Sequence, residues 1–329
     1  MTRMERDRRV SLAAGCRVWL RVVGVVAIVL GGSTGGRAEP VANPRYRAGV
    51  DLVTLDVCVR DRQGRLVPAL TRDDFLIVDG GVTRRPAFFV GGDPVPLAAV
   101  LLIDRSSSMS GHPLEQARLA AAAFMRTIRP TDLVEVLAFD QRVERLSAFG
   151  VDVAAAGPAI HAMEAGGSTA LYDAILVARQ DLRAALDENP RDYRQAIVIL
   201  SDGEDTGSLL AFDDVLDQIR RSGVLVYAVS LRADARGRPA PPTWPLARLA
   251  VDTGGRAIGV AEPQALAALY EDVNHELRHL YRLGYEPANV PADGRWRPLS
   301  VRVARPDAYV RTRGGYYAPR PPTELAGRR

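Results

Sequence analysis

The chain has 329 residues, 47% hydrophobic and 25% charged, so it can bury a substantial core and is not a disordered tail. Its formal net charge is +4, but residues 1–38 alone carry seven arginines and only two acids. Without that segment the charge is −1, which leaves no basic stripe that would favour nucleic-acid binding.

The first 38 residues have the order of a secretory signal peptide. An arginine-rich start precedes the apolar run VVGVVAIVLGG, and small residues follow up to Ala38. The apolar run is about half of the roughly 20 residues that a spanning helix needs. We therefore expect cleavage after Ala38 and export to the periplasm, the cell surface or the medium. Membrane attachment is expected only if this segment is retained.

Two residue counts narrow the possible chemistry. Every basic residue is an arginine, which excludes lysine-base and Schiff-base chemistry. Only Cys58 remains after removal of the signal peptide, so neither an internal disulfide nor a cysteine-based zinc site is expected. Because Cys58 lies within the β-like segment VTLDVCVRD, we expect it to be a small buried residue of a strand.

The remaining chain divides into three regions and a tail. Residues 39–96 read as β structure and end in the breaker cluster GGDPVP. Residues 97–280 alternate strands with helices. The β pattern returns over residues 281–319, and residues 320–329 read as a loose tail.

The central region predicts an α/β fold. Apolar strands are expected near residues 97–104, 133–140, 195–201 and 224–231, with shorter strands near 143–149 and 255–260. Helices are expected over 113–128, 171–186, 212–221, 245–252 and 263–280. Fully apolar strands that alternate with helices indicate a mostly parallel, doubly wound sheet covered on both faces.

The two flanking regions, residues 45–90 and 281–319, are expected to fold together. Neither region alone has enough strands to bury the two faces of a sheet. We therefore expect them to form one β-sandwich into which the α/β domain is inserted.

Oxygen-bearing side chains gather where the central strands end. LLIDRSSSM places Asp104, Ser106 and Ser108 after the first strand, GGSTALYD places Thr169 before a helix, and VILSDG ends in Asp202. Ligands of open parallel sheets bind beyond the carboxyl ends of the strands. Two carboxylates and three hydroxyls, without sulfur or imidazole, suit a hard divalent cation such as Mg²⁺.

These three motifs, in this order, resemble the metal-ion-dependent adhesion site of a von Willebrand factor type A domain. The flanks also resemble those of a family of secreted bacterial proteins of this type, so the resemblance covers roughly residues 45–319. It implies a Rossmann-like domain without enzymatic activity. It also implies that the five residues bind Mg²⁺ or Mn²⁺ and leave one position for a carboxylate from a protein partner. We expect Arg105 to face solvent and Asp173 either to support the loop or to favour its helix dipole.

Three alternatives remain. His275, Glu276 and His279 match the H-E-x-x-H pattern of zinc peptidases within residues 275–279, although Glu276 and Arg278 also fit an ordinary charged helix surface. A serine hydrolase that uses the serines near Asp104 is disfavoured because none of these serines lies in a G-x-S-x-G motif. The third alternative is a structural module of the cell envelope whose metal site is idle.

Overall fold

The computed structural model describes residues 52–92, 95–150, 153–201, 204–231, 238–260, 262–287 and 290–320. The predicted signal peptide, Asp202 and all but the first residue of the predicted tail lie outside these ranges. Within them, no helix is both long enough and apolar enough to cross a bilayer.

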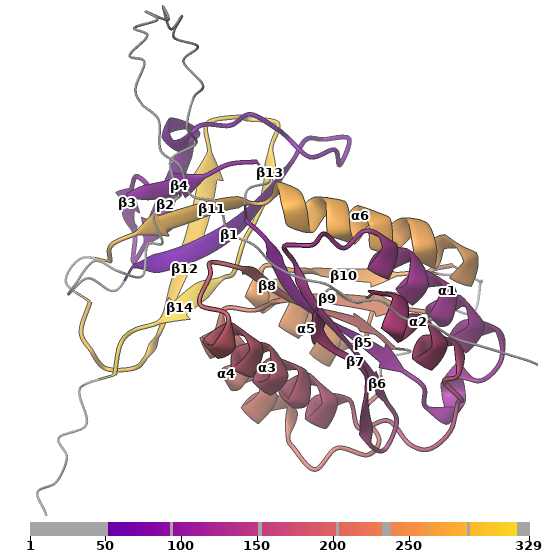
Figure 1. Cartoon of the computed structure of the whole chain (residues 1–329). Coiled ribbons are helices and arrows are strands. Elements are labelled where there is room, and N and C mark those ends of the chain that lie inside the picture. Colours follow the sequence, from indigo (N-terminus) through magenta and orange to yellow (C-terminus); the bar gives the residue numbers. More distant parts are fainter. Residues whose placement is uncertain are drawn as a thin grey trace, which may run out of the picture. The chain divides into compact units, whose positions relative to one another are not determined.

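A six-stranded mixed sheet forms the centre of the α/β core (Figure 1). In spatial order its strands are β10 (Arg256–Gly259), β9 (Leu225–Ser230), β8 (Arg194–Leu200), β5 (Leu97–Asp104), β6 (Leu133–Phe139) and β7 (Val143–Gly150). Neighbouring strands are parallel except for the edge strand β7, which runs antiparallel to β6. All eight residues of β5 are buried, as expected for a central strand covered on both faces.

Helices cover both faces of this sheet (Figure 1). One side holds α1 (His112–Arg126), α2 (Val153–His161) and α6 (Leu266–His279), and the other holds α3 (Leu171–Glu188), α4 (Phe212–Ser222) and α5 (Trp244–Thr253). Successive side chains of a strand point to opposite faces of the sheet, so alternate residues of β5 pack against the two groups of helices. Leu101 packs with the first group and Leu102 with the second. Three 3₁₀ turns complete the helices: η2 (Arg72–Asp74), η3 (Ser107–Met109) and η4 (Pro263–Ala265).

The flanks form two four-stranded antiparallel sheets, and each sheet takes two strands from each flank. The first is ordered β13 (Tyr309–Arg311), β1 (Val53–Arg60), β11 (Tyr281–Tyr285) and β4 (Phe88–Val90). The second is ordered β14 (Gly315–Tyr317), β12 (Trp296–Val303), β2 (Phe75–Asp79) and β3 (Val82–Arg84). Their inner faces share one apolar core that includes Leu55, Ile77, Leu283 and Val301. The predicted sandwich built from both ends of the chain is therefore confirmed.

Two details differ from the sequence prediction. Helix α2 was not predicted, because Gly157 and Pro158 disfavour a helix, and Pro158 lies inside it. At the end of the predicted β region 281–319, the segment AYVRTRGGYYAP is expected to form one strand. It instead contributes β13 to one sheet and β14 to the other. Gly314 lies between the two strands and Gly315 begins β14. At Gly315 a Cβ would lie 2.3 Å from the backbone oxygen of Arg297, so only glycine fits there.

Buried ion pairs join the sandwich to the α/β core. Asp56 on β1 accepts hydrogen bonds from Arg194 of β8 (Nε to Oδ1, 3.2 Å) and from Arg282 of β11 (Nε to Oδ1, 3.1 Å). Arg194 also donates to the backbone oxygen of Leu280 at 2.8 Å. The Arg194 side chain is 1% exposed and that of Arg282 is 4% exposed, so these charges interact with little screening by water.

A second buried carboxylate, Glu276 of α6, lies between the same two layers. It has no exposed surface and accepts hydrogen bonds from Arg60 of β1, Arg311 of β13 and the hydroxyl of Tyr227 on β9. Arg278 is also buried and pairs with Asp132 at 2.7 Å. The expectation that Glu276 and Arg278 belong to an ordinary charged helix surface is therefore wrong. The sandwich covers Glu276, and Arg278 packs against Asp132 and Thr127 of the α/β core.

The Asp56 pair gives a stability prediction. Burial alone would raise the pKa of Asp56, but the attraction and hydrogen bonds of Arg282 and Arg194 lower it to about 2. Asp56→Asn leaves both arginines without this charge, so we expect a loss of about 3–5 kcal/mol in the free energy of unfolding at pH 7. Since the folded pKa lies below the unfolded one, the advantage of the parent should be full above about pH 4 and fade towards pH 2.

Urea unfolding of both proteins at several pH values measures this difference. The matched control is Asp307→Asn, which removes an exposed carboxylate that pairs with Arg62, and it should change stability by less than about 0.5 kcal/mol. Equal effects of the two substitutions would contradict the role given to Asp56.

Candidate metal centre

Asp104 ends β5 and is completely buried. Its Oδ1 accepts a hydrogen bond from the backbone N–H of Ser106 (2.8 Å), and its Oδ2 accepts one from the hydroxyl of Ser201 (2.6 Å). Ser201 directly follows β8, the strand beside β5. The two bonds fix the orientation of the carboxylate at the carboxyl edge of the sheet.

The hydroxyls of Ser106 and Ser108 lie 3.0 Å apart. Two neighbouring ligands of an octahedral Mg²⁺ at 2.0–2.1 Å would be separated by about 2.9 Å, so this spacing fits two ligands of one ion. The intervening Ser107 holds the loop in place: its backbone N–H and its hydroxyl both donate to the backbone oxygen of Gly167, at 3.1 and 2.9 Å.

Thr169 comes to the same place from the loop before α3. It is 5% exposed, and its backbone N–H donates to the hydroxyl of Thr206 at 3.0 Å. Its backbone oxygen accepts from the N–H groups of Thr206 and Gly207. At Gly207 a Cβ would lie 2.7 Å from the hydroxyl oxygen of Ser168, so glycine lets the two loops approach closely.

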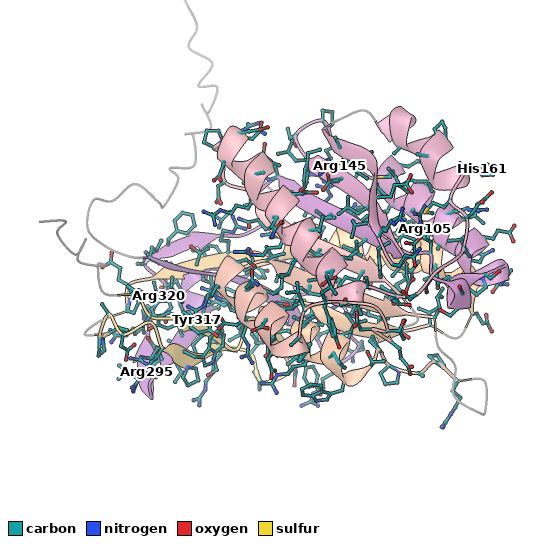
Figure 2. All side chains as sticks on the ribbon, turned by 90° about the horizontal axis from the view of Figure 1, so that it is seen from below. Arg105, Arg145, His161, Arg295, Tyr317 and Arg320 are labelled. Carbon is teal, nitrogen blue, oxygen red and sulfur yellow. The ribbon has the colours of Figure 1, made fainter. Side chains whose placement is uncertain are left out.

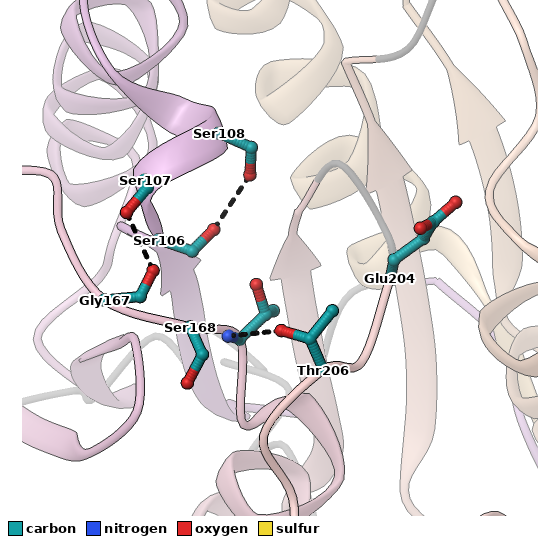
Figure 3. Close-up of a pocket in the computed structure, with 8 residues that line it drawn as sticks. Ser106, Ser107, Ser108, Gly167, Ser168, Glu204 and Thr206 are labelled. Carbon is teal, nitrogen blue, oxygen red and sulfur yellow. Dashed lines mark hydrogen bonds between the residues drawn. The ribbon is translucent and has the colours of Figure 1, made fainter.

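Together these loops line an open cleft of about 370 Å³ (Figure 3). Ser106 and Ser108 lie on one side of the cleft and Glu204 on the loop opposite. Four of the five predicted site residues are thus near one another. The fifth, Asp202, lies outside the described residues, but Ser201 before it bonds to Asp104 and Glu204 after it lines the cleft. Its role as a ligand stays a prediction.

Two acids support the loop that follows β8. Asp205 accepts hydrogen bonds from the first backbone N–H groups of α3, at Leu171 (2.8 Å) and Tyr172 (3.3 Å), and so caps that helix. Asp173 accepts from the backbone N–H groups of Leu209 and Leu210 (3.1 and 3.3 Å). Of the two roles considered for Asp173, support of the loop is the one that these bonds describe.

Arg105 does not face solvent as expected. Its side chain is 18% exposed and pairs with Asp140 (3.1 Å) and Glu144 (2.5 Å). These acids follow β6 and lie on β7, so Arg105 connects the ends of three adjacent strands beside the cleft. The partners are 35 and 39 positions away in sequence, and no local pattern marks them.

The H-E-x-x-H segment has a geometry that does not suit a zinc peptidase. The rings of His275 and His279 lie 4.1 Å apart, with His275 exposed. Glu276 instead lies in the interior, where Arg60, Arg311 and Tyr227 occupy its carboxylate. A general base must reach the water that it activates. Within the described ranges, no three or more His, Cys, Asp or Glu residues are grouped so that they could hold a metal ion.

Residues 99–204 match the family model of the von Willebrand factor type A domain. The chain is 30% identical to the human inter-alpha-trypsin inhibitor heavy chain H6 over 209 residues, which are 59% of this chain and 16% of that protein. It spans between 16% and 26% of the length of the curated relatives that it matches.

Two solved structures are similar to this chain. A von Willebrand factor type A protein from Catenulispora acidiphila is 14% identical and superposes with a TM-score of 0.51, covering 84% of this chain and 65% of that one. Proximal thread matrix protein 1 from the mussel byssus, described with a zinc-occupied MIDAS motif, is 16% identical with a TM-score of 0.46 and covers 61% of this chain and 50% of that one. From β5 to α6, the chain therefore has the fold of a von Willebrand factor type A domain, flanked by two antiparallel sheets from the segments on either side.

Proposed function

We propose that this protein binds a protein partner through a divalent cation, Mg²⁺ or Mn²⁺, held at the cleft. The proposed ligands are Asp104, Ser106, Ser108, Thr169 and Asp202. The observation that carries the proposal is the pair of hydroxyls 3.0 Å apart beside an oriented, buried carboxylate. Neutral hydroxyls and carboxylates are hard oxygen donors, which suit these ions.

The donor set leaves room for an acidic partner. The two carboxylates and three hydroxyls supply five ligands, one fewer than an octahedral ion takes, and the hydroxyls reduce the charge of the ion less than further carboxylates would. The cleft is open, so a carboxylate from another protein has access to it. The cation would supply electrostatic attraction for that carboxylate, while Asp104 and the serines hold their positions through the hydrogen bonds described above.

The same geometry favours binding over hydrolysis. The hydroxyl of Ser106 pairs with that of Ser108 and not with a basic side chain, whereas a serine nucleophile needs an adjacent base. We therefore propose that the protein is not an enzyme. Because a signal peptide is predicted over residues 1–38, we also propose that the partner lies outside the cytoplasm. A structural envelope role with an idle metal site is the remaining alternative.

An exposed apolar patch at the same carboxyl edge of the sheet indicates which residues of the partner lie next to its acidic side chain. Leu209 is 94% exposed and Trp244 is 65% exposed. Trp244 packs on Phe212 (ring centroids 5.3 Å apart), which packs on Tyr172 (5.8 Å). These aromatic residues stand at the beginnings of α3, α4 and α5, and Leu209 belongs to the loop that carries Glu204. We propose that the partner presents bulky apolar residues next to its acidic side chain, because burial of such exposed groups stabilises an interface.

Calorimetry with Mg²⁺ and Mn²⁺ tests the metal site. The parent should bind one ion, and Asp104→Ala or Asp202→Ala should abolish binding because each removes a charged ligand. At a metal concentration of 100 times the dissociation constant, the parent should gain about 2.7 kcal/mol of stability and the variants none. The control is Asp187→Ala at the exposed end of α3, which should bind like the parent. If both variants bind as well as the parent, the site is wrongly assigned.

Retention of proteins from envelope extracts tests the partner surface. Binding should be lost with EDTA and with Asp104→Ala. Leu209→Ser and Trp244→Ala should keep metal binding but weaken partner binding by about tenfold or more, since an exposed anchor of this size contributes over 1.4 kcal/mol. Val82→Ser is the matched control, because Val82 is 52% exposed on the sandwich. An equal loss in the Val82 variant would contradict the assignment of this patch.

A further inference from the structure

A second cleft, of about 710 Å³, lies between the end of α4 and the sandwich. Four arginines line it, Arg220 and Arg221 from α4 and Arg313 and Arg320 from the C-terminal flank. Helix α4 begins at the carboxyl edge of the sheet and ends here, so this cleft lies at the other edge and shares no residue with the metal cleft. Figure 2 shows Tyr317 and Arg320 together and far from Arg105, which marks the metal side.

Two of the four arginines are already neutralised. Arg220 donates from Nε to Asp252 Oδ2 at 2.9 Å, and Arg221 donates from Nε to Asp217 Oδ2 at 2.8 Å. The guanidinium of Arg221 also lies over the ring of Tyr317, 3.6 Å from its centre. Such stacking and pairing hold these two side chains in place and form one wall of the cleft.

The other two arginines make no direct ion pair among the described residues: Asp56 attracts Arg313 and Asp217 attracts Arg320 without touching them. Neither Arg313 nor Arg320 makes a hydrogen bond or an ion pair within that part of the chain, although Arg313 is partly buried and its Nε is shielded from solvent. Burial lowers the pKa of Arg313, only partly offset by the attraction of Asp56. A shielded donor without an acceptor is costly unless a ligand or an ordered water completes it.

We infer that this cleft binds a small organic anion with two negative charges, a phosphate monoester or a dicarboxylate. A guanidinium pairs with phosphate or carboxylate through two parallel hydrogen bonds, so Arg313 and Arg320 match two negative charges. The cleft also exceeds what one inorganic ion fills, and its volume is in the range of about 300–1,000 Å³ of small-molecule sites. Tyr317 and Pro319 provide a wall for the apolar body of the ligand.

Titration calorimetry of the purified protein with phenyl phosphate, phthalate and inorganic phosphate tests this inference. Phenyl phosphate or phthalate should bind with a stoichiometry of one and should bind more weakly as ionic strength rises. Arg313→Gln and, separately, the exposed Arg320→Gln should each lower the affinity roughly tenfold to a hundredfold. Because Arg320 lies at the surface, its variant reports on the site even if the Arg313 variant does not fold.

Two controls separate this site from others. Arg295→Gln removes an arginine that is 82% exposed near Tyr317 and Arg320 in Figure 2, and it should leave the affinity unchanged. Asp104→Ala should also bind the anions normally, because the inference does not rest on the proposed metal site. Absence of saturable binding to both organic probes, or equal losses in the Arg295 and Arg320 variants, would overturn the inference. Equal affinity for inorganic phosphate and phenyl phosphate would overturn the role of the apolar wall.

Discussion

Two buried carboxylates, each shared by arginines, determine how the two layers of this protein meet. Asp56 and Glu276 would be costly charges in the interior if they were alone. Asp56 is paired by arginines of β8 and β11, and Glu276 by arginines of β1 and β13. Each cluster therefore includes both an α/β element and a strand of the sandwich. Because apolar contacts are non-directional, it is the hydrogen-bond geometry of these pairs that fixes one relative placement of the layers.

Because the sandwich packs against one edge of the central sheet, the clefts at the two edges are lined by different side-chain groups. At the carboxyl edge, the strands end in Asp104, the serines and the loop after β8, and the cleft there offers oxygen donors. At the other edge the sandwich covers the sheet, and the second cleft offers guanidinium groups. One edge is thus suited to a cation and the other to an anion. Since the two clefts share no residue, ligands could occupy both at the same time.

The sequence predicts those features that follow from local pattern and from strand direction. Apolar strands that alternate with helices must place their carboxyl ends at one edge, so the grouping of Asp104 with Thr169 could be expected before the structure. The environment of Glu276 could not, because its partners on β1, β9 and β13 are distant in sequence. The same holds for Arg105 and its pairs with Asp140 and Glu144. Helix α2 was missed for the opposite reason: Pro158 opposes a helix locally, and packing of Ala156 and Ile160 on the core overrides that preference.

The buried ion pairs between the two layers give a physical reason for arginine, and not lysine, at these positions. A composition without lysine can arise from the source genome alone, but the joint between the layers needs properties that lysine lacks. A buried lysine loses its proton readily, whereas a guanidinium stays charged. Arg194 also donates to Asp56 and to the backbone oxygens of Leu277 and Leu280 at once, which requires several donors in a fixed plane. At this position, then, arginine connects β8, β1 and the end of α6 through one side chain, and an ammonium group could not replace those directed contacts.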